Sequence, residues 1–146
     1  MSERHPPADI TIITEHRQRV DKDRTKALVH AVCATLKLRG SIGILFTNNA
    51  GIRTYNRQFR NKNKATDVLS FTGGTDGHIG DIVISCEWVR NAYAPAKRRA
   101  MTDELIIHGL LHVSGEHHTY STASLAKNRA RMDIIKKSIE TVIRLR

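Results

Sequence analysis

The chain has 146 residues and a formal net charge of +10 at pH 7, and hydrophobic residues make up 40% of it. This length predicts one domain with its own hydrophobic core, and the composition excludes a disordered chain. No apolar run approaches the roughly 18 residues that cross a membrane, and the N-terminus has no apolar signal region. We therefore expect a cytoplasmic protein without membrane contact. The excess of positive charge favours a polyanionic partner.

Hydrophobic periodicity divides the chain into short strands and amphipathic helices. In chain order we expect a strand at 10–13, a helix at 21–38, a strand at 41–47, a helix at 49–59, strands at 67–71 and 79–85, helices at 87–93 and 101–114, and a last helix from 121. The order β-α-β-α-β-β-α-α-α predicts an α+β fold, with a small mixed sheet of about four strands packed with about five helices. Residues 1–8 are expected to form a flexible tail before a single layered domain at 9–146.

Single residues are expected to set the helix ends. Asp21 or Asp23 is a candidate N-cap of the first helix, because a short carboxylate can accept from the free N–H groups of the first turn. Gly40 is expected to end that helix, and Gly115 to end the helix at 101–114, because glycine adopts the left-handed conformation without strain.

A histidine motif at 108–118 begins on the helix at 101–114 and continues into the loop after it. His108 and His112 stand four residues apart, so their imidazoles project from one helix face and can share a metal ion. After Gly115 the chain can turn back and deliver a third imidazole, for which the spacing selects His118. Three histidine ligands leave a fourth zinc position open for water, which is typical of a catalytic site, and zinc makes that water more acidic.

The same spacing occurs in metzincin proteases, where a Glu directly after the first His is the general base. Here that position is Gly109, which cannot transfer a proton, so peptide hydrolysis by that route is disfavoured. Phosphodiester cleavage needs such a carboxylate less, because cations can hold the developing charge. Glu116 is either a base from the following loop or a solvated acid, and His117 either hydrogen-bonds beside the metal or faces solvent.

The segment at 53–64 carries five cations and no acid, interleaved with Tyr55 and Phe59. Arginine offers a planar fork that matches phosphate oxygens, so the segment is a candidate phosphate-binding element. Its candidate RNA contacts, besides Arg60, are Arg57, Lys62 and Lys64. The alternative is a solvated helix face with both aromatic side chains in the core. That alternative would account for Arg53 and some of the lysines.

Four segments together carry a family resemblance. They are, in chain order, Asn56–Arg60, Thr66–Phe71, Gly80–Ser85 and the histidine motif. From about Ile10 to the last helix, the chain resembles the YbeY family, the metal-dependent endoribonucleases of ribosomal RNA maturation. The resemblance implies one zinc ion per chain on His108, His112 and His118, and it places the family's functional arginine on Arg60 as the catalytic cation.

The resemblance also implies a substrate and partners. These are single-stranded precursor rRNA, cut near the 3′ end of 16S rRNA, the small ribosomal subunit with its assembly factors, and a role in ribosome quality control. Two departures stand out, because the family usually has Asp at the position of His117 and Leu at that of Val113. The first removes an acidic neighbour of the third ligand, unless Glu116 replaces it.

Other assignments stay open at this stage. Asp67 and Asp81 are turn or capping acids on the simplest interpretation, Gly80 permits a close backbone approach, and Ser70 either lines the cleft or bonds to backbone. The net charge of +5 over 121–146 either contacts rRNA or is a solvated helix face. Two alternative functions also remain: a metal-dependent hydrolase of another substrate class, and a non-catalytic ribosome assembly factor with structural zinc.

Overall fold

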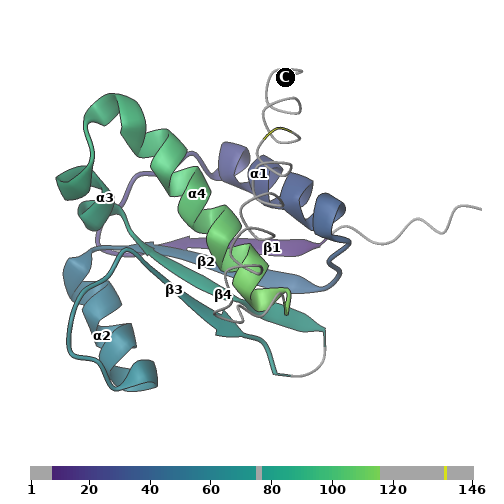
Figure 1. Ribbon diagram of the computed structural model, residues 1–146, viewed down its shortest axis with the longest axis horizontal. Coiled ribbons are helices and arrows are strands. Elements are labelled where there is room, and N and C mark those ends of the chain that lie inside the picture. The colour runs from purple at the N-terminus through teal and green to yellow at the C-terminus, as the bar shows by residue number, and fades with distance from the viewer. Residues whose placement is uncertain (1–7, 75–76, 116–136, 138–146) are drawn as a thin grey trace, which may run out of the picture.

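The computed structural model describes residues 8–74, residues 77–115 and Lys137. Within these residues a mixed four-stranded sheet is packed with helices, which confirms the α+β fold (Figure 1). The elements in chain order are β1 (Asp9–Thr14), α1 (Lys22–Leu36), β2 (Ser41–Thr47), α2 (Asn49–Arg60), β3 (Val68–Thr72), β4 (His78–Ser85), α3 (Cys86–Ala92) and α4 (Pro95–Val113). The last predicted helix, from 121, lies outside the described residues, so a total of five helices is not confirmed.

The sheet has the strand order β1-β2-β4-β3. Strand β2 pairs in parallel with β1 and β4, and β3 runs antiparallel to β4 at one edge. The register aligns Ile12 with Ile44, and Ile44 with Ile82, so one apolar row crosses three strands on the same face. Because side chains alternate between the faces of a strand, the opposite face carries the intervening residues, such as Leu45 and Val83.

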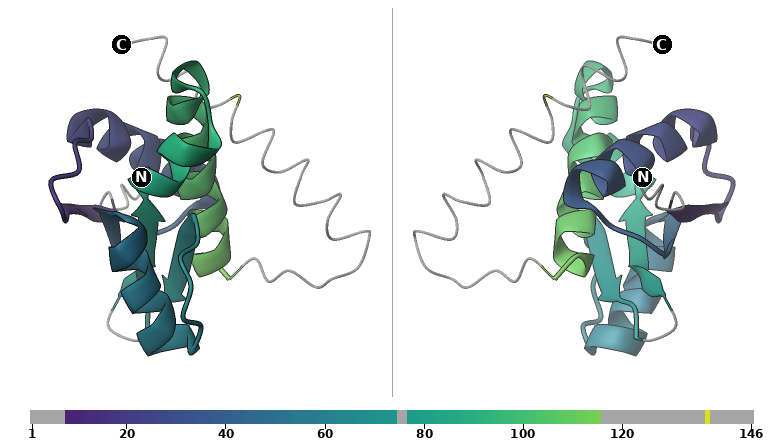
Figure 2. Two further views of the ribbon diagram at one scale, coloured as in Figure 1. Left: turned by 90° about the vertical axis from the view of Figure 1, so that its left-hand side faces the viewer. Right: turned by 90° about the vertical axis from the view of Figure 1, so that its right-hand side faces the viewer.

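Helices α1 and α4 cover one face of the sheet and enclose the main core. Its fully buried side chains include Leu28 of α1 and Leu110 of α4, packed with the apolar row of the strands. Helix α2 covers part of the opposite face, over a smaller cluster of Ile52, Leu69 and Val83. Figure 2 shows α2 and α4 on opposite sides of the sheet. The two faces therefore differ in how far helices close them.

Helix α4 begins at Pro95, six residues before the predicted start at 101. Proline fits the first position of a helix, because its fixed φ is helical and its missing N–H would have no helical partner there. The basic run at 97–99 is therefore helical. The predicted end is confirmed, since α4 ends at Val113 and Gly115 adopts a φ of +85°.

The predicted role of Gly40 as the end of the first helix is wrong. Helix α1 ends at Leu36, and Lys37 adopts the left-handed conformation with a φ of 55°. Gly40 instead leads into β2 with a φ of +117°, and a Cβ there would lie 2.0 Å from the carbonyl oxygen of Gly77. At the other end, the Oδ1 atom of Asp21 accepts from the Arg24 N–H at 3.0 Å, which settles the N-cap.

The described part of the chain begins with a buried residue. Ala8, which the sequence assigned to the tail, is only 6% exposed and belongs to the main core. Residues 1–7 lie outside the described part of the chain. Among the described helices, none combines the length and the apolar character that crossing a bilayer requires.

Candidate active site at the edge of the sheet

Two of the predicted ligands lie together on α4. His108 is half-buried and His112 is exposed, while the neighbouring Leu110 and Leu111 are buried in the core. The ring centroids of the two histidines are 5.0 Å apart, with an angle of 74° between the ring planes. Because the apolar side of α4 is held against the sheet, both imidazoles are presented on the remaining side, as the spacing predicted.

Gly109, between the two histidines, packs directly on the sheet. A Cβ at this position would lie 2.9 Å from the Cγ2 atom of Ile82. Glycine therefore allows α4 to approach β4 closely. This contact supplies a structural reason for the missing glutamate, because a longer side chain here would push the helix away from the strand.

Arg60 lies at the C-terminal end of α2, beside the edge strand β3. Its Nη2 atom donates a hydrogen bond to the carbonyl oxygen of Ser70 at 2.5 Å. Its Cζ atom lies 5.4 Å from the ring centroid of Phe71, which is within the range of a cation–π interaction. Arg60 is exposed, so these two contacts orient the guanidinium group while leaving it accessible.

The turn after α2 reverses the chain, so that β3 runs beside Arg60. Asn61 caps the helix in the left-handed conformation, with a φ of 56°. The buried Asn56 side chain donates to the Lys64 carbonyl oxygen at 2.9 Å, and Arg53 donates to Asn63 at 2.8 Å. Asn56 and Arg53 therefore both have a structural role, because each side chain binds the turn to the helix.

A cavity of about 110 Å³ lies between α2, β3 and α4. It is lined by Arg60 of α2, His108 and His112 of α4, and the β3 residues Val68–Ser70. The structure thus brings three of the four residues predicted for catalysis and metal binding to one place. The fourth, His118, lies outside the described residues, as do Glu116 and His117. Arg57, Lys62 and Lys64 are exposed and do not line this cavity, so their contact with RNA stays a prediction.

The donor set fits a zinc ion as far as the structure describes it. Zinc takes neutral imidazole ligands, and a pair four residues apart on one helix face is a usual part of such a site. In the described ranges 8–74 and 77–115, no group of three or more His, Cys, Asp or Glu side chains is placed to hold a metal. A three-histidine zinc site would therefore need a residue outside those ranges, and the sequence assigns that role to His118 as a prediction.

Several motif residues have architectural roles. The Asp67 carboxylate accepts from the Val68 N–H at 2.8 Å at the start of β3, so the capping interpretation holds for Asp67. It is wrong for Asp81, which lies inside β4 and not at its start. A Cβ on Gly80 would lie 2.6 Å from the Phe71 carbonyl oxygen and 2.7 Å from Val113, which confirms the close approach. Ser70 lines the cavity and accepts from Arg60 through its carbonyl oxygen.

The aromatic surroundings of Arg60 were not predicted from the sequence. Phe59 is 66% exposed, so the interpretation that placed it in the core is wrong. Its ring meets the Phe71 ring edge-on, with centroids 5.3 Å apart. A signal existed in the sequence, because Phe59 directly precedes Arg60 and Phe71 ends the motif segment at 66–71.

Comparisons with known proteins show the family to which the chain belongs. Residues 10–139 match a family model described as "Endoribonuclease YbeY". Endoribonuclease YbeY of Roseiflexus is 30% identical, in an alignment that covers 95% of this chain and 96% of the relative. That of Gluconobacter oxydans is 36% identical, over 79% and 74% of the two chains. The Koribacter versatilis protein of the same name is 43% identical, over 56% of this chain and 55% of the relative's length.

A solved structure supports the fold. The solution structure of a Thermotoga maritima protein superposes with a TM-score of 0.53 at 22% identity, covering 91% of this chain and 88% of the other. The class that these matches define is a family of endoribonucleases, hydrolases of RNA phosphodiester bonds. The chain belongs to the YbeY family.

Proposed function

We propose that this chain is a zinc-dependent endoribonuclease of single-stranded RNA, with one zinc ion on His108, His112 and His118. The observation that carries the proposal is the shared cavity of Arg60, His108 and His112, which come from two helices on opposite faces of the sheet. Membership of the YbeY family and the names of its curated relatives support an endoribonuclease activity. The described residues supply a cation and metal-binding imidazoles for it.

Arg60 is the residue that we assign to the reacting phosphate. A guanidinium group has five N–H donors, and the hydrogen bond to the Ser70 carbonyl oxygen uses one of them. The others can donate to phosphate oxygens in the fork geometry that arginine favours. Because Ser70 and Phe71 hold the group in place, its charge is oriented before substrate binds, which is how positioned cations stabilise a developing negative charge.

The histidines have a separate role. When bound, zinc would supply Lewis acidity and lower the pKa of a bound water towards neutrality. His108 and His112 would hold the ion at the wall of the cavity that Arg60 also lines. A phosphate placed between them would meet a cation on one side and the metal site on the other, which is an arrangement suited to phosphodiester cleavage.

A peptide substrate is disfavoured by the packing of α4. The position that holds the general base in metzincins is Gly109, which lies against Ile82 and has no room for a carboxylate. The exposed cations close to Arg60 in the chain, among them Arg57 and Lys62, also favour an anionic substrate.

The cellular role completes the proposal. We infer that the substrate is precursor rRNA and that the cut contributes to maturation of the 3′ end of 16S rRNA and to ribosome quality control. The partners would then be the small ribosomal subunit and its assembly factors, in the cytoplasm. The support for this part is the motif resemblance together with the net charge of +10, which suits a polyanionic partner.

The test is a double variant, His108→Ala with His112→Ala, assayed for zinc content and for cleavage of a single-stranded precursor rRNA. We expect both to be lost, because removal of two imidazoles leaves too few ligands for zinc. His30→Ala is the matched control, since His30 is an exposed histidine on α1 and should leave both unchanged. Zinc content and cleavage at wild-type levels in the double variant would overturn the proposal.

A further inference from the structure

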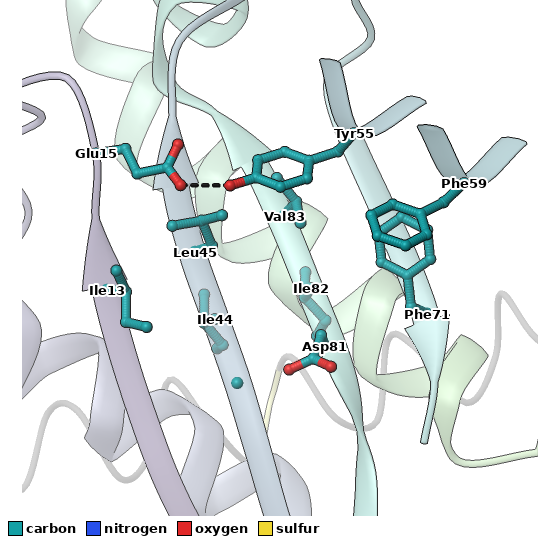
Figure 3. A pocket seen from close by; sticks show the side chains of 11 residues that line it. Ile13, Glu15, Ile44, Leu45, Tyr55, Phe59, Phe71, Asp81, Ile82 and Val83 are labelled. Carbon is teal, nitrogen blue, oxygen red and sulfur yellow. Dashed lines mark hydrogen bonds between the residues drawn. The ribbon is translucent and has the colours of Figure 1, made fainter. Parts of the chain in front are cut away.

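A groove larger than the active-site cavity lies on the face of the sheet that α2 covers in part. Its volume is about 420 Å³, which is within the range of small-molecule sites. Leu45 and Val83 contribute to its floor, Tyr55 and Phe59 of α2 flank one side, and Glu15 and Asp81 lie at opposite ends (Figure 3). The groove is therefore mainly apolar and aromatic, with carboxylates at its two ends.

The groove and the active-site cavity meet at the edge of the sheet. Phe71 lines the groove, and its ring also supports the Arg60 guanidinium group at 5.4 Å. Phe59 packs edge-on against Phe71, with 66% of its own surface exposed. Phe59, Phe71 and Arg60 thus form a continuous row that passes from the groove to the cavity of the two histidines.

We propose that this groove binds the unpaired base next to the phosphate held by Arg60, and that Phe59 and Phe71 are its stacking surface. The inference rests on the proposed function, which places a phosphate on Arg60. Exposed aromatic side chains beside a cationic phosphate site are the usual means of holding single-stranded nucleic acid, because every base has a flat aromatic face. A base paired in a duplex could not enter, so the groove would give preference for single strands.

The charges favour a base over a second phosphate. Glu15 and Asp81 would repel phosphate oxygens, whereas a carboxylate accepts hydrogen bonds from the amino group of a base. The Tyr55 hydroxyl already donates to Glu15. Basic residues instead lie along 57–64, next to Arg60. The backbone would therefore follow the basic side and the base would turn into the groove.

Asp81 is positioned for such a contact. Its Oδ2 atom lies 3.0 Å from the Nε2 atom of His78. Its Oδ1 atom lies above Gly43, where a Cβ would come within 2.3 Å of it. Glycine in β2 therefore leaves room for this carboxylate at the end of the groove. We expect a base with an amino group, such as cytosine, to be bound in preference to uracil.

The first experiment locates the base. Short single-stranded oligoribonucleotides of one sequence each carry a single 2-aminopurine, moved one position at a time along the chain. Stacking quenches 2-aminopurine fluorescence, so we expect the wild-type protein to quench it strongly at one or two positions next to the cleaved bond. Equal quenching at all positions, or none at any, would overturn the inference.

The second experiment assigns the stacking surface. Phe59→Ala should weaken binding of the oligoribonucleotide by about 5- to 150-fold, the range found for loss of one base–aromatic contact, and should abolish the local quenching. Phe59→Tyr should retain both, because the ring remains. Trp88→Ala is the control, since Trp88 is a partly exposed aromatic residue of α3 outside the groove and should behave as wild type.

The outcomes separate this inference from the proposed function. If Phe59→Ala binds RNA as tightly as wild type, the base site is wrong, while loss of cleavage in the histidine variant would still support the active site. If Phe59→Ala reduces binding to ribosomal particles but not to the oligoribonucleotide, the groove docks a protein and the inference is overturned. If the histidine double variant cleaves RNA normally, the proposed function fails whatever Phe59 does.

Discussion

The two faces of the sheet differ in how completely helices cover them, and the candidate site lies where they meet. On one face, α1 and α4 close over the apolar row, and Leu110 and Ile82 are fully buried. On the other face, α2 leaves Ile13 53% exposed and Phe59 66% exposed beside a groove. The closed face can hold His108 and His112 in fixed positions, and the open face has room for a ligand. Arg60 contacts the edge strand between them.

The largest effect on stability is expected when one large side chain on each face is replaced by alanine and the two losses are compared. Leu110→Ala should lower the free energy of unfolding by about 3 kcal/mol, because it opens a cavity in a fully enclosed core. Ile13→Ala should cost about 1 kcal/mol or less, since the side chain is already half in water. Urea denaturation of both variants measures the difference. Equal losses of unfolding free energy in the two variants would show that helices cover the two faces equally well, which would contradict the difference described above.

The next effect concerns the contact of α4 with the sheet. Gly80→Ala should destabilise the fold by about 2 kcal/mol, because the added methyl group meets the Phe71 carbonyl oxygen and the Val113 side chain at once. Gly74→Ala is the matched control, since a Cβ at Gly74 has no described atom within 4 Å. Thermal unfolding midpoints report both, and a Gly80→Ala variant as stable as the control would mean that α4 does not pack this closely.

The smallest effect lies on the open face and appears at alkaline pH. The hydrogen bond to Glu15, aided by burial and by the charge of Glu15, raises the pKa of Tyr55 to about 12. A folded-state pKa above the unfolded value of about 10 means that this contact stabilises the fold below pH 10 and is lost as the pH rises towards 12. Tyr55→Phe should therefore be less stable than wild type near pH 8, by an amount that shrinks above pH 10.

Urea denaturation of Tyr55→Phe and wild type across that pH range measures the difference. A stability gap between the two proteins that stays constant up to pH 12 would contradict the assigned contact. A gap that widens with pH would contradict its sign.

The sequence predicted most of the fold because its signals are local. The strand at 41–47 contains the apolar run 42–46 and is bounded by Gly40 and Asn48, and its predicted bounds are confirmed. The start of α4 was missed because Pro95 can end one element or begin the next, and only its position in space decides which. The final predicted helix, from 121, lies outside the described residues.

The candidate site was predictable where one element carries it. The spacing of His108 and His112 defines one helix face, which the structure confirms. The contact of Arg60 with Ser70 depends on the turn after α2 and on the edge position of β3, which local patterns do not specify. The exposure of Phe59 was not predicted for the same reason, because hydrophobic periodicity does not show that α2 covers only part of one face of the sheet.

The most direct test of the central claim, that Arg60 and the histidines form one active site with separate roles, is Arg60→Ala assayed for zinc and for RNA cleavage together. We expect a wild-type zinc content with cleavage of single-stranded RNA reduced by about 100-fold or more, because a positioned cation is lost while the ligands remain. Wild-type cleavage by Arg60→Ala would contradict the account, as would loss of zinc with loss of cleavage.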